Sequence, residues 1–208
     1  MPLDPQAEQL LKAMASAGLP PLETLSPPVA RAQMEAMRVA RGGAVEPVHQ
    51  VEDRTIPGPA GPIPVRVYTP AGAGPFPLLV YYHGGGWVIG DLNSHDGVCR
   101  SLTNLAQCVT VSVDYRLAPE HKFPAAVDDA YAAAVWVSEH GRELGGDPAK
   151  LAVGGDSAGA TLSAVIAHLA RDRDKPPIRF QLLVYPATDP LLDTSRGGST
   201  PNTSLLHG

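Results

Sequence analysis

Residues 155–159 read Gly-Asp-Ser-Ala-Gly and carry the most specific chemical signal in the chain. They match the G-x-S-x-G pattern, follow the apolar run 151–153 and open a helical stretch, which is where this pattern holds a serine on a sharp turn. A hydroxyl exposed on such a turn can attack a carbonyl, and the first amides of the following helix can stabilise the oxyanion that develops. We therefore predict that Ser157 is a nucleophile and that the Ala158 N–H is an oxyanion donor. The alternative is that the glycines only make a tight turn or bind an anion loosely.

A second motif lies earlier in the chain, where residues 83–87 read His-Gly-Gly-Gly-Trp after the apolar run 78–82. It matches the HGGG-type loop whose backbone N–H groups complete an oxyanion hole. Such a loop could instead hold a phosphate, but the chain has neither a G-K-[ST] ending nor a G-x-G-x-x-G run with an acidic residue in register. Two motifs in the order that hydrolases use are more specific than either alone, and they argue against nucleotide binding.

These motifs, together with Asp-Tyr-Arg-Leu-Ala-Pro-Glu at 114–120, resemble those of the bacterial hormone-sensitive-lipase-like carboxylesterases. The resemblance extends to about residue 189, and it implies that Ser157 is the nucleophile. It implies that the oxyanion hole is formed by the backbone amides of Gly85, Gly86 and Ala158. It gives structural or motif-supporting roles to His83, Gly84, Gly155, Asp156 and Gly159. It implies no cofactor and no metal. The chain departs from the family at Ala160, usually glycine, where we expect only altered packing.

The general base that a serine nucleophile needs is harder to find. In this fold the chain order is Ser, then Asp or Glu, then His, and the only histidines after Ser157 are His168 and His207. His168 falls in a predicted helix and reads as a surface or packing residue. Asp189 follows an apolar strand, so Ser157, Asp189 and His207 form a possible triad in the correct order. The family places these partners on later strands, which we expect this chain to lack.

Apolar periodicity indicates which elements hold the motifs. The predicted strands are 48–56, 63–68, 78–82, 109–115, 151–154 and 180–185. The predicted helices are 5–18, one beginning at the N-cap Ser26, 94–106, 124–140 and 158–173. The first two strands read as a hairpin, and the later alternation of strands and helices predicts an α/β fold of the α/β-hydrolase type, with a mostly parallel sheet and flanking helices. We expect 180–185 to present an unpaired apolar edge.

This pattern predicts three segments. Residues 1–43 are N-terminal cap helices by resemblance, 44–193 a partial α/β-hydrolase core, and 194–208 a disordered tail rich in Ser, Thr, Gly and Asn. Within the cap, Met34 and Met37 lie on one helical face; we expect them to pack in a core, although they could instead border a greasy pocket.

Composition excludes several partners. Sixteen basic and 21 acidic residues leave a net charge of −5 without a basic run, so nucleic acid is not expected. No apolar run reaches the length of about 20 residues that membrane insertion requires, and no signal peptide is visible. Cys99 and Cys108 read as small core residues in a cytoplasmic protein. The oligomeric state is open.

The sequence therefore indicates a carboxylic-ester hydrolase that acts on short or medium acyl esters, small-molecule substrates, through an acyl-enzyme on Ser157. Two alternatives stay open. One is a non-catalytic protein that binds a carboxylate ligand in the same pocket, and the other is a truncated fragment without function.

Overall fold

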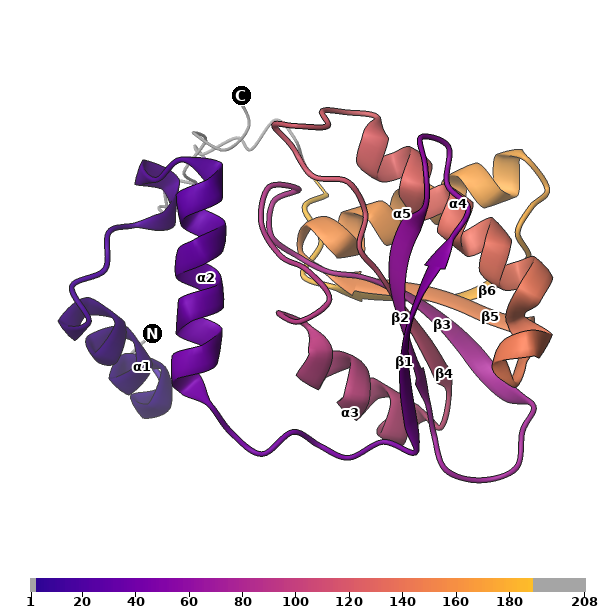
Figure 1. The fold of residues 1–208 in the computed structure, drawn as a ribbon, viewed down its shortest axis with the longest axis horizontal. Coiled ribbons are helices and arrows are strands. Elements are labelled where there is room, and N and C mark those ends of the chain that lie inside the picture. The colour runs from indigo at the N-terminus through magenta and orange to yellow at the C-terminus, as the bar shows by residue number, and fades with distance from the viewer. Residues whose placement is uncertain (1–2, 189–208) are drawn as a thin grey trace.

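The computed structural model describes residues 3–188 and contains one six-stranded sheet in the order β1-β2-β4-β3-β5-β6 (Figure 1). Its strands are β1 (Gln50–Ile56), β2 (Ile63–Thr69), β3 (Phe76–Tyr82), β4 (Val109–Val113), β5 (Gly146–Asp156) and β6 (Ile178–Val184). The predicted hairpin of β1 and β2 is confirmed, and β2 also runs antiparallel to β4. The remaining pairs, β4 with β3, β3 with β5 and β5 with β6, are parallel.

Helices cover both faces of the sheet, as predicted. α4 (Ala125–His140) and α5 (Ala158–Asp172) cover one face, and α3 (Asp96–Ala106) covers the other. Residues 3–188 also contain two short 3-10 helices, η1 (Leu22–Thr24) and η2 (Gly141–Leu144). Because β4 is covered on both sides, all five of its residues are buried, including the polar Thr110 and Ser112.

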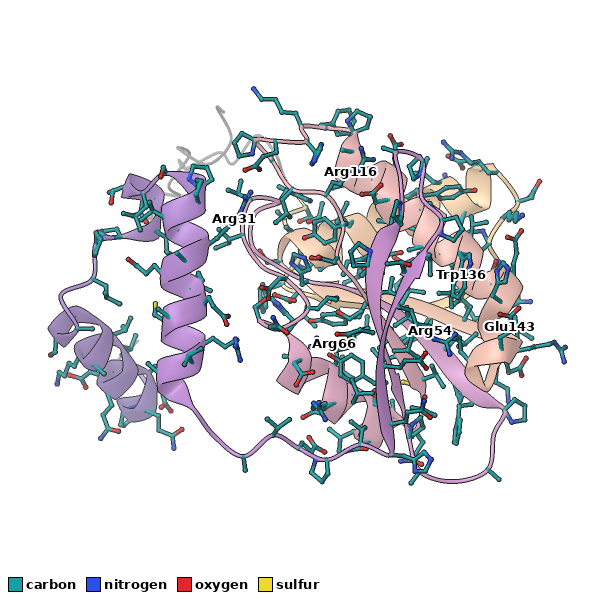
Figure 2. All side chains as sticks on the ribbon, in the orientation of Figure 1. Arg31, Arg54, Arg66, Arg116, Trp136 and Glu143 are labelled. Atoms are coloured by element: carbon teal, nitrogen blue, oxygen red, sulfur yellow. The ribbon has the colours of Figure 1, made fainter. Side chains whose placement is uncertain are left out.

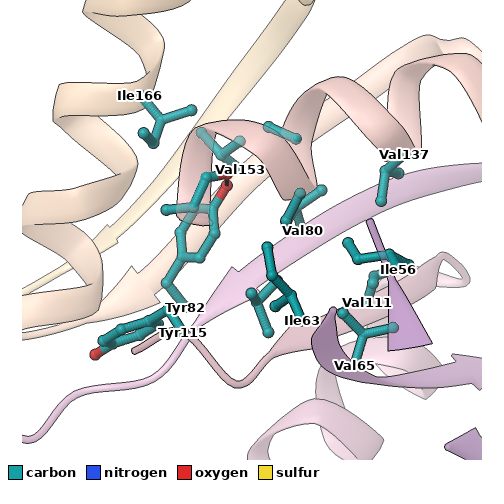
Figure 3. Close-up of a cluster of buried hydrophobic side chains, with 14 of the residues drawn as sticks. Ile56, Ile63, Val65, Val80, Tyr82, Val111, Tyr115, Val137, Val153 and Ile166 are labelled. Carbon is teal, nitrogen blue, oxygen red and sulfur yellow. Dashed lines mark hydrogen bonds between the residues drawn. The ribbon is translucent and has the colours of Figure 1, made fainter. Parts of the chain in front are cut away.

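The larger core lies between the sheet and the pair α4 and α5 (Figure 3). Tyr82 and Tyr115 are its largest members, and the Tyr82 hydroxyl donates to the Ala130 carbonyl at 2.8 Å. The smaller core beneath α3 contains both cysteines, Cys99 and Cys108, which are buried and free, as the sequence predicted.

The two N-terminal helices, α1 (Pro5–Ser16) and α2 (Pro27–Arg41), stand beside the sheet layers rather than within them (Figure 1). Ser26 is the N-cap residue of α2 as predicted, although its side chain makes no capping hydrogen bond. The prediction that Met34 and Met37 pack in a core was wrong: both are half-buried and belong to neither core cluster. The reason is that α2 faces loops rather than the sheet, and Met34 borders a hollow described below.

β6 lies at the edge of the sheet and pairs only with β5 among residues 3–188. Phe180 is 64% exposed there, and Tyr185, just after the strand, is 70% exposed. The expected apolar edge is therefore present in the described part of the chain.

Candidate active site

Ser157 occupies the sharp turn between β5 and α5. Its backbone has φ 50° and ψ −118°, a conformation that costs a non-glycine residue about 1–3 kcal/mol. Two backbone hydrogen bonds hold it there: the Ser157 N–H donates to the Val184 carbonyl of β6 at 2.9 Å, and the Thr161 N–H donates to the Ser157 carbonyl at 3.0 Å. Gly155 and Gly159 flank the turn so closely that a Cβ on either would overlap the Tyr82 carbonyl oxygen. The turn is thus pressed against the end of β3.

The glycine loop, residues 83–90, follows β3 at the carboxyl ends of the strands. The serine turn lies at the same end, because β3 and β5 are parallel and Tyr82 is in register with Gly155. The N–H groups of Val88 and Ile89 donate to the Gly85 carbonyl at 3.1 and 3.0 Å, which folds the loop back on itself. Gly85 and Gly86 have φ of +127° and +60°, a region that favours glycine. A Cβ on Gly86 would meet nothing within 4 Å, so this residue borders open space.

Three backbone amides at the carboxyl ends of β3 and β5 are free to bind a ligand. Within residues 3–188, the N–H groups of Gly85, Gly86 and Ala158 donate to no acceptor. Ala158 is the first residue of α5, where an amide has no partner within its own helix. These are the three amides that the resemblance assigns to an oxyanion hole.

The Asp156 carboxylate joins the serine turn to the glycine loop. It accepts hydrogen bonds from the Tyr81 hydroxyl at 2.7 Å, the Gly84 N–H at 3.1 Å and the Tyr185 hydroxyl at 3.2 Å. His95 Nε2 lies 3.2 Å from its Oδ1. Although desolvation acts to raise the pKa of Asp156, hydrogen bonds from His95 and Tyr81 hold it near 2. Asp156 is therefore an anion that orders both motifs.

His83 is fully buried beneath the glycine loop. Its ring stacks on Tyr115 with centroids 4.4 Å apart, and its Nδ1–H donates to the Gly84 carbonyl at 2.8 Å. The Tyr115 hydroxyl donates to the His83 carbonyl at 2.6 Å. Burial lowers the pKa of His83 to about 4, so the ring is neutral at neutral pH. These contacts support the structural role that the resemblance implies.

No histidine contacts the Ser157 side chain through a hydrogen bond in residues 3–188. His168 is exposed on α5, as predicted, and His95 faces Asp156 instead. Asp189 and His207, the candidate triad partners, lie outside the described residues. Sequence reasoning missed His95, because no spacing signal links position 95 to a motif 61 residues away.

Arg31 connects α2 to the glycine loop and to the loop that contains Ala118 and Glu120 (Figure 2). Its guanidinium donates to the Val88 carbonyl at 2.8 Å, to the Ala118 carbonyl at 2.9 Å and to both oxygens of Glu120 at 2.8 Å. A hollow of about 530 Å³ lies beside these contacts, with Met34, Asp114, Leu117 and His121 among its lining residues. α2 therefore docks on the glycine loop through a polar contact rather than an apolar core.

Asp114 borders this hollow, and we expect its carboxyl group to make the free energy of unfolding depend on pH. Desolvation, with a smaller contribution from Asp91, raises the pKa of Asp114 to about 6, against about 3.9 in an unfolded chain. Between these values the folded state binds more protons than the unfolded state, so Asp114 makes stability fall as pH rises through that window. We expect Asp114→Asn to be more stable than the wild type by about 1–2 kcal/mol at pH 7, allowing for partial exposure, and equal to it near pH 4.

Urea denaturation at both pH values measures this difference. Asp172→Asn is the control, because Asp172 is an exposed partner of Arg171 and its loss should change stability only slightly at both pH values. An Asp114→Asn advantage of the same size at pH 4 and pH 7 would contradict the prediction.

The described residues contain no helix that is both long and apolar enough to cross a membrane. Nor do residues 3–188 bring together three His, Cys, Asp or Glu side chains in an arrangement that could hold a metal ion.

Comparisons with known proteins find relatives that are named as esterases and carboxylic ester hydrolases. The chain is 48% identical over 210 residues to the carboxylic ester hydrolase LipN of Mycobacterium tuberculosis. This alignment covers 98% of this chain and 56% of that protein. The chain is 55% identical over 149 residues to the esterase LipI of the same organism, covering 69% and 47% respectively. The chain thus spans about half the length of the curated relatives it matches.

Solved structures and a family model agree with this result. The hyperthermophilic esterase of the archaeon Pyrobaculum calidifontis is 52% identical and superposes with a TM-score of 0.85, over 90% of this chain and 60% of that one. A family model described as the alpha/beta hydrolase fold matches residues 79–206. Because this match covers more than half of the sequence, the chain belongs to the α/β-hydrolase fold family, and its resemblance to the hormone-sensitive-lipase-like carboxylesterases is confirmed.

Proposed function

We propose that this protein is a carboxylic-ester hydrolase whose nucleophile is Ser157. The observation that carries the proposal is the position of Ser157 on a strained turn at the carboxyl end of β5. The unpaired amides of Gly85, Gly86 and Ala158 lie at the same end of the sheet. Its relatives carry the names of esterases and carboxylic ester hydrolases, which supports the same reaction class. The substrate is a small-molecule ester with a short or medium acyl chain.

In the first half of the reaction, Ser157 Oγ attacks the ester carbonyl carbon. Negative charge develops on the carbonyl oxygen, and the amides of Gly85, Gly86 and Ala158 are the donors proposed to stabilise it. Collapse of the tetrahedral intermediate breaks the ester C–O bond, releases the alcohol and leaves an acyl-enzyme that water then hydrolyses.

The attack also needs a base that takes the Ser157 proton and returns it to the leaving alcohol. His207 remains this chain's candidate for the base, and Asp189 remains the candidate for the carboxylate that orients it. The helices α1 and α2 are proposed as the cap, because Arg31 holds α2 against the glycine loop beside the hollow.

Turnover of p-nitrophenyl butyrate by the purified 208-residue chain tests the proposal. We expect Ser157→Ala to reduce turnover by at least about 100-fold, since the variant has no acyl acceptor. Ser138→Ala is the matched control, because Ser138 lies on α4 and only donates to the Val135 carbonyl of its own helix. Labelling by a fluorophosphonate should add mass to the peptide that contains Ser157 and to no other.

Three results would overturn the proposal. Turnover that persists in Ser157→Ala would remove Ser157 from the reaction. A chain that melts cooperatively and binds short carboxylates, yet shows neither turnover nor labelling, would support the non-catalytic binding alternative. A chain without a cooperative melt and without activity would support the fragment alternative.

A further inference from the structure

His95 lies between the serine turn and the glycine loop although it belongs to neither motif. It precedes α3, and its Nε2 is 3.2 Å from Oδ1 and 3.4 Å from Oδ2 of Asp156. Both side chains are largely buried, with 17% of His95 and 15% of Asp156 exposed. The His95 ring also packs 5.5 Å from the His83 ring and 6.3 Å from the Tyr81 ring, centroid to centroid.

Nε2 of His95 is a donor in either protonation state, because the ionised Asp156 carboxylate that it faces can only accept, and the contacts of the second ring nitrogen permit this. Nδ1 lies 2.9 Å from Ser94 Oγ, which accepts from the Asp91 N–H at 2.9 Å and lies 2.8 Å from the Asp91 carbonyl. When His95 is neutral, the Ser94 hydroxyl can donate to Nδ1; when it is charged, Nδ1–H donates to Ser94 Oγ and the hydroxyl turns to the Asp91 carbonyl. Both arrangements leave Nε2–H directed at Asp156.

The carboxylate that His95 faces is also the acceptor for the glycine loop. Asp156 Oδ1 accepts from the Gly84 N–H at 3.1 Å, and Gly84 directly precedes the two glycines proposed as oxyanion donors. A Cβ on Gly84 would overlap Asp156 Oδ2, so the loop backbone lies directly against this carboxylate. Because Asp156 is adjacent to Ser157 in the chain, its orientation sets the loop relative to the nucleophile.

We propose that His95 is a positioning residue: through Asp156 it holds the glycine loop where the amides of Gly85 and Gly86 meet the oxyanion formed at Ser157. The catalytic consequence rests on the proposed function, whereas the ordering of the loop does not. A displacement of reacting groups by about 1 Å can reduce a rate by about 100-fold, so loss of this contact should be visible in kcat.

Two substitutions of similar polarity distinguish a side chain that can still donate to Asp156 from one that only fills the position of His95. The amide nitrogen of His95→Gln stands near Nε2 and can still donate to Asp156, whereas that of His95→Asn stands near Nδ1 and cannot. Hydrogen exchange of the peptide 83–90 is the primary measurement, because it reports loop order without needing activity. We expect exchange there to be at least about tenfold faster in His95→Asn and within about threefold of the wild type in His95→Gln. His140→Asn, at the C-terminal end of α4 where the His140 ring stacks on Trp136, should leave that peptide unchanged.

A double-mutant cycle tests whether His95 acts through Asp156. We expect Asp156→Asn to accelerate exchange of 83–90 as strongly as His95→Asn does, and the double variant to add little, since residues that act as one unit are not additive. Additive effects would overturn the proposal. Should His95→Asn fail to melt cooperatively, Asp156→Asn decides alone, and unchanged exchange in it would also overturn the proposal.

Ester turnover supplies a second measurement. We expect kcat to fall by at least about tenfold in His95→Asn with KM within about threefold of the wild-type value, and His95→Gln to restore most of kcat. If the wild type shows no turnover at all, the proposed function fails, and the exchange experiment still decides the role of His95. Equal exchange in wild type and a folded His95→Asn would refute that role whatever the turnover.

Discussion

Gly159→Ala is expected to lower the free energy of unfolding by about 3 kcal/mol or more, at the upper end of the cost of overpacking. A Cβ at this position would overlap the Tyr82 carbonyl oxygen and would lie 2.5 Å from the Tyr82 carbonyl carbon and 2.7 Å from the His83 carbonyl oxygen. All three are backbone atoms at the end of a central strand, so no flexible side chain can move aside. Relief requires separating α5 from β3, which also moves Ser157 away from the glycine loop.

Gly97→Ala is the matched control for this prediction. Gly97 and Gly159 are each the second residue of a helix, α3 and α5, but a Cβ on Gly97 would meet nothing within 4 Å. Alanine there should be neutral or should stabilise by up to about 1 kcal/mol, because it is the better helix former. Urea denaturation with comparison of midpoints and slopes measures both effects. Similar changes in the two variants would show that the close approach of α5 to β3 is not what limits the position.

Asp129→Ala is expected to cost about 3 kcal/mol, the lower end of the range for removing one partner of a buried ion pair. Asp129 is 1% exposed and accepts three hydrogen bonds from Arg116: from its backbone N–H at 3.0 Å, from Nε at 2.8 Å and from Nη2 at 2.8 Å. The variant leaves these donors without their acceptor. The lower end of the range applies because the Arg116 side chain is 27% exposed and water can partly replace the carboxylate.

The neighbouring Asp128 provides the comparison, because it is adjacent to Asp129 in α4 and exposed. Asp128→Ala removes a favourable interaction with the helix dipole and a solvent-screened attraction to Arg116, so we expect a loss below about 1 kcal/mol. Thermal and urea unfolding should therefore rank Asp129→Ala well below Asp128→Ala. Equal losses would mean that Arg116 finds other acceptors.

The Asp129 contact also bears on the site. Arg116 follows Tyr115, whose hydroxyl and ring hold His83 beneath the glycine loop. A variant that weakens the Arg116 anchor should therefore loosen this loop as well as the fold.

Much of this protein could be predicted from the sequence because the relevant signals are local. Ser157 is recognisable because a strand, a tight turn and a helix follow one another within a few residues, and the three glycines after His83 are recognisable because they directly follow a strand. Apolar runs similarly predicted every strand, with ends that differ by a few residues, such as β5, which starts at Gly146 rather than at 151. Backbone conformation and the alternation of apolar residues depend on near neighbours, so short stretches of sequence carry them.

Contacts between distant segments were decided only by the packing of the chain. His95 faces Asp156, Arg31 reaches Val88 and Ala118, and Met34 borders a hollow instead of a core. Each of these depends on where a side chain lies relative to a segment more than 50 residues away. Such a side chain is placed by the summed packing of the sheet and its helices, and no residue type or spacing in one segment specifies which partner the folded chain will bring to it.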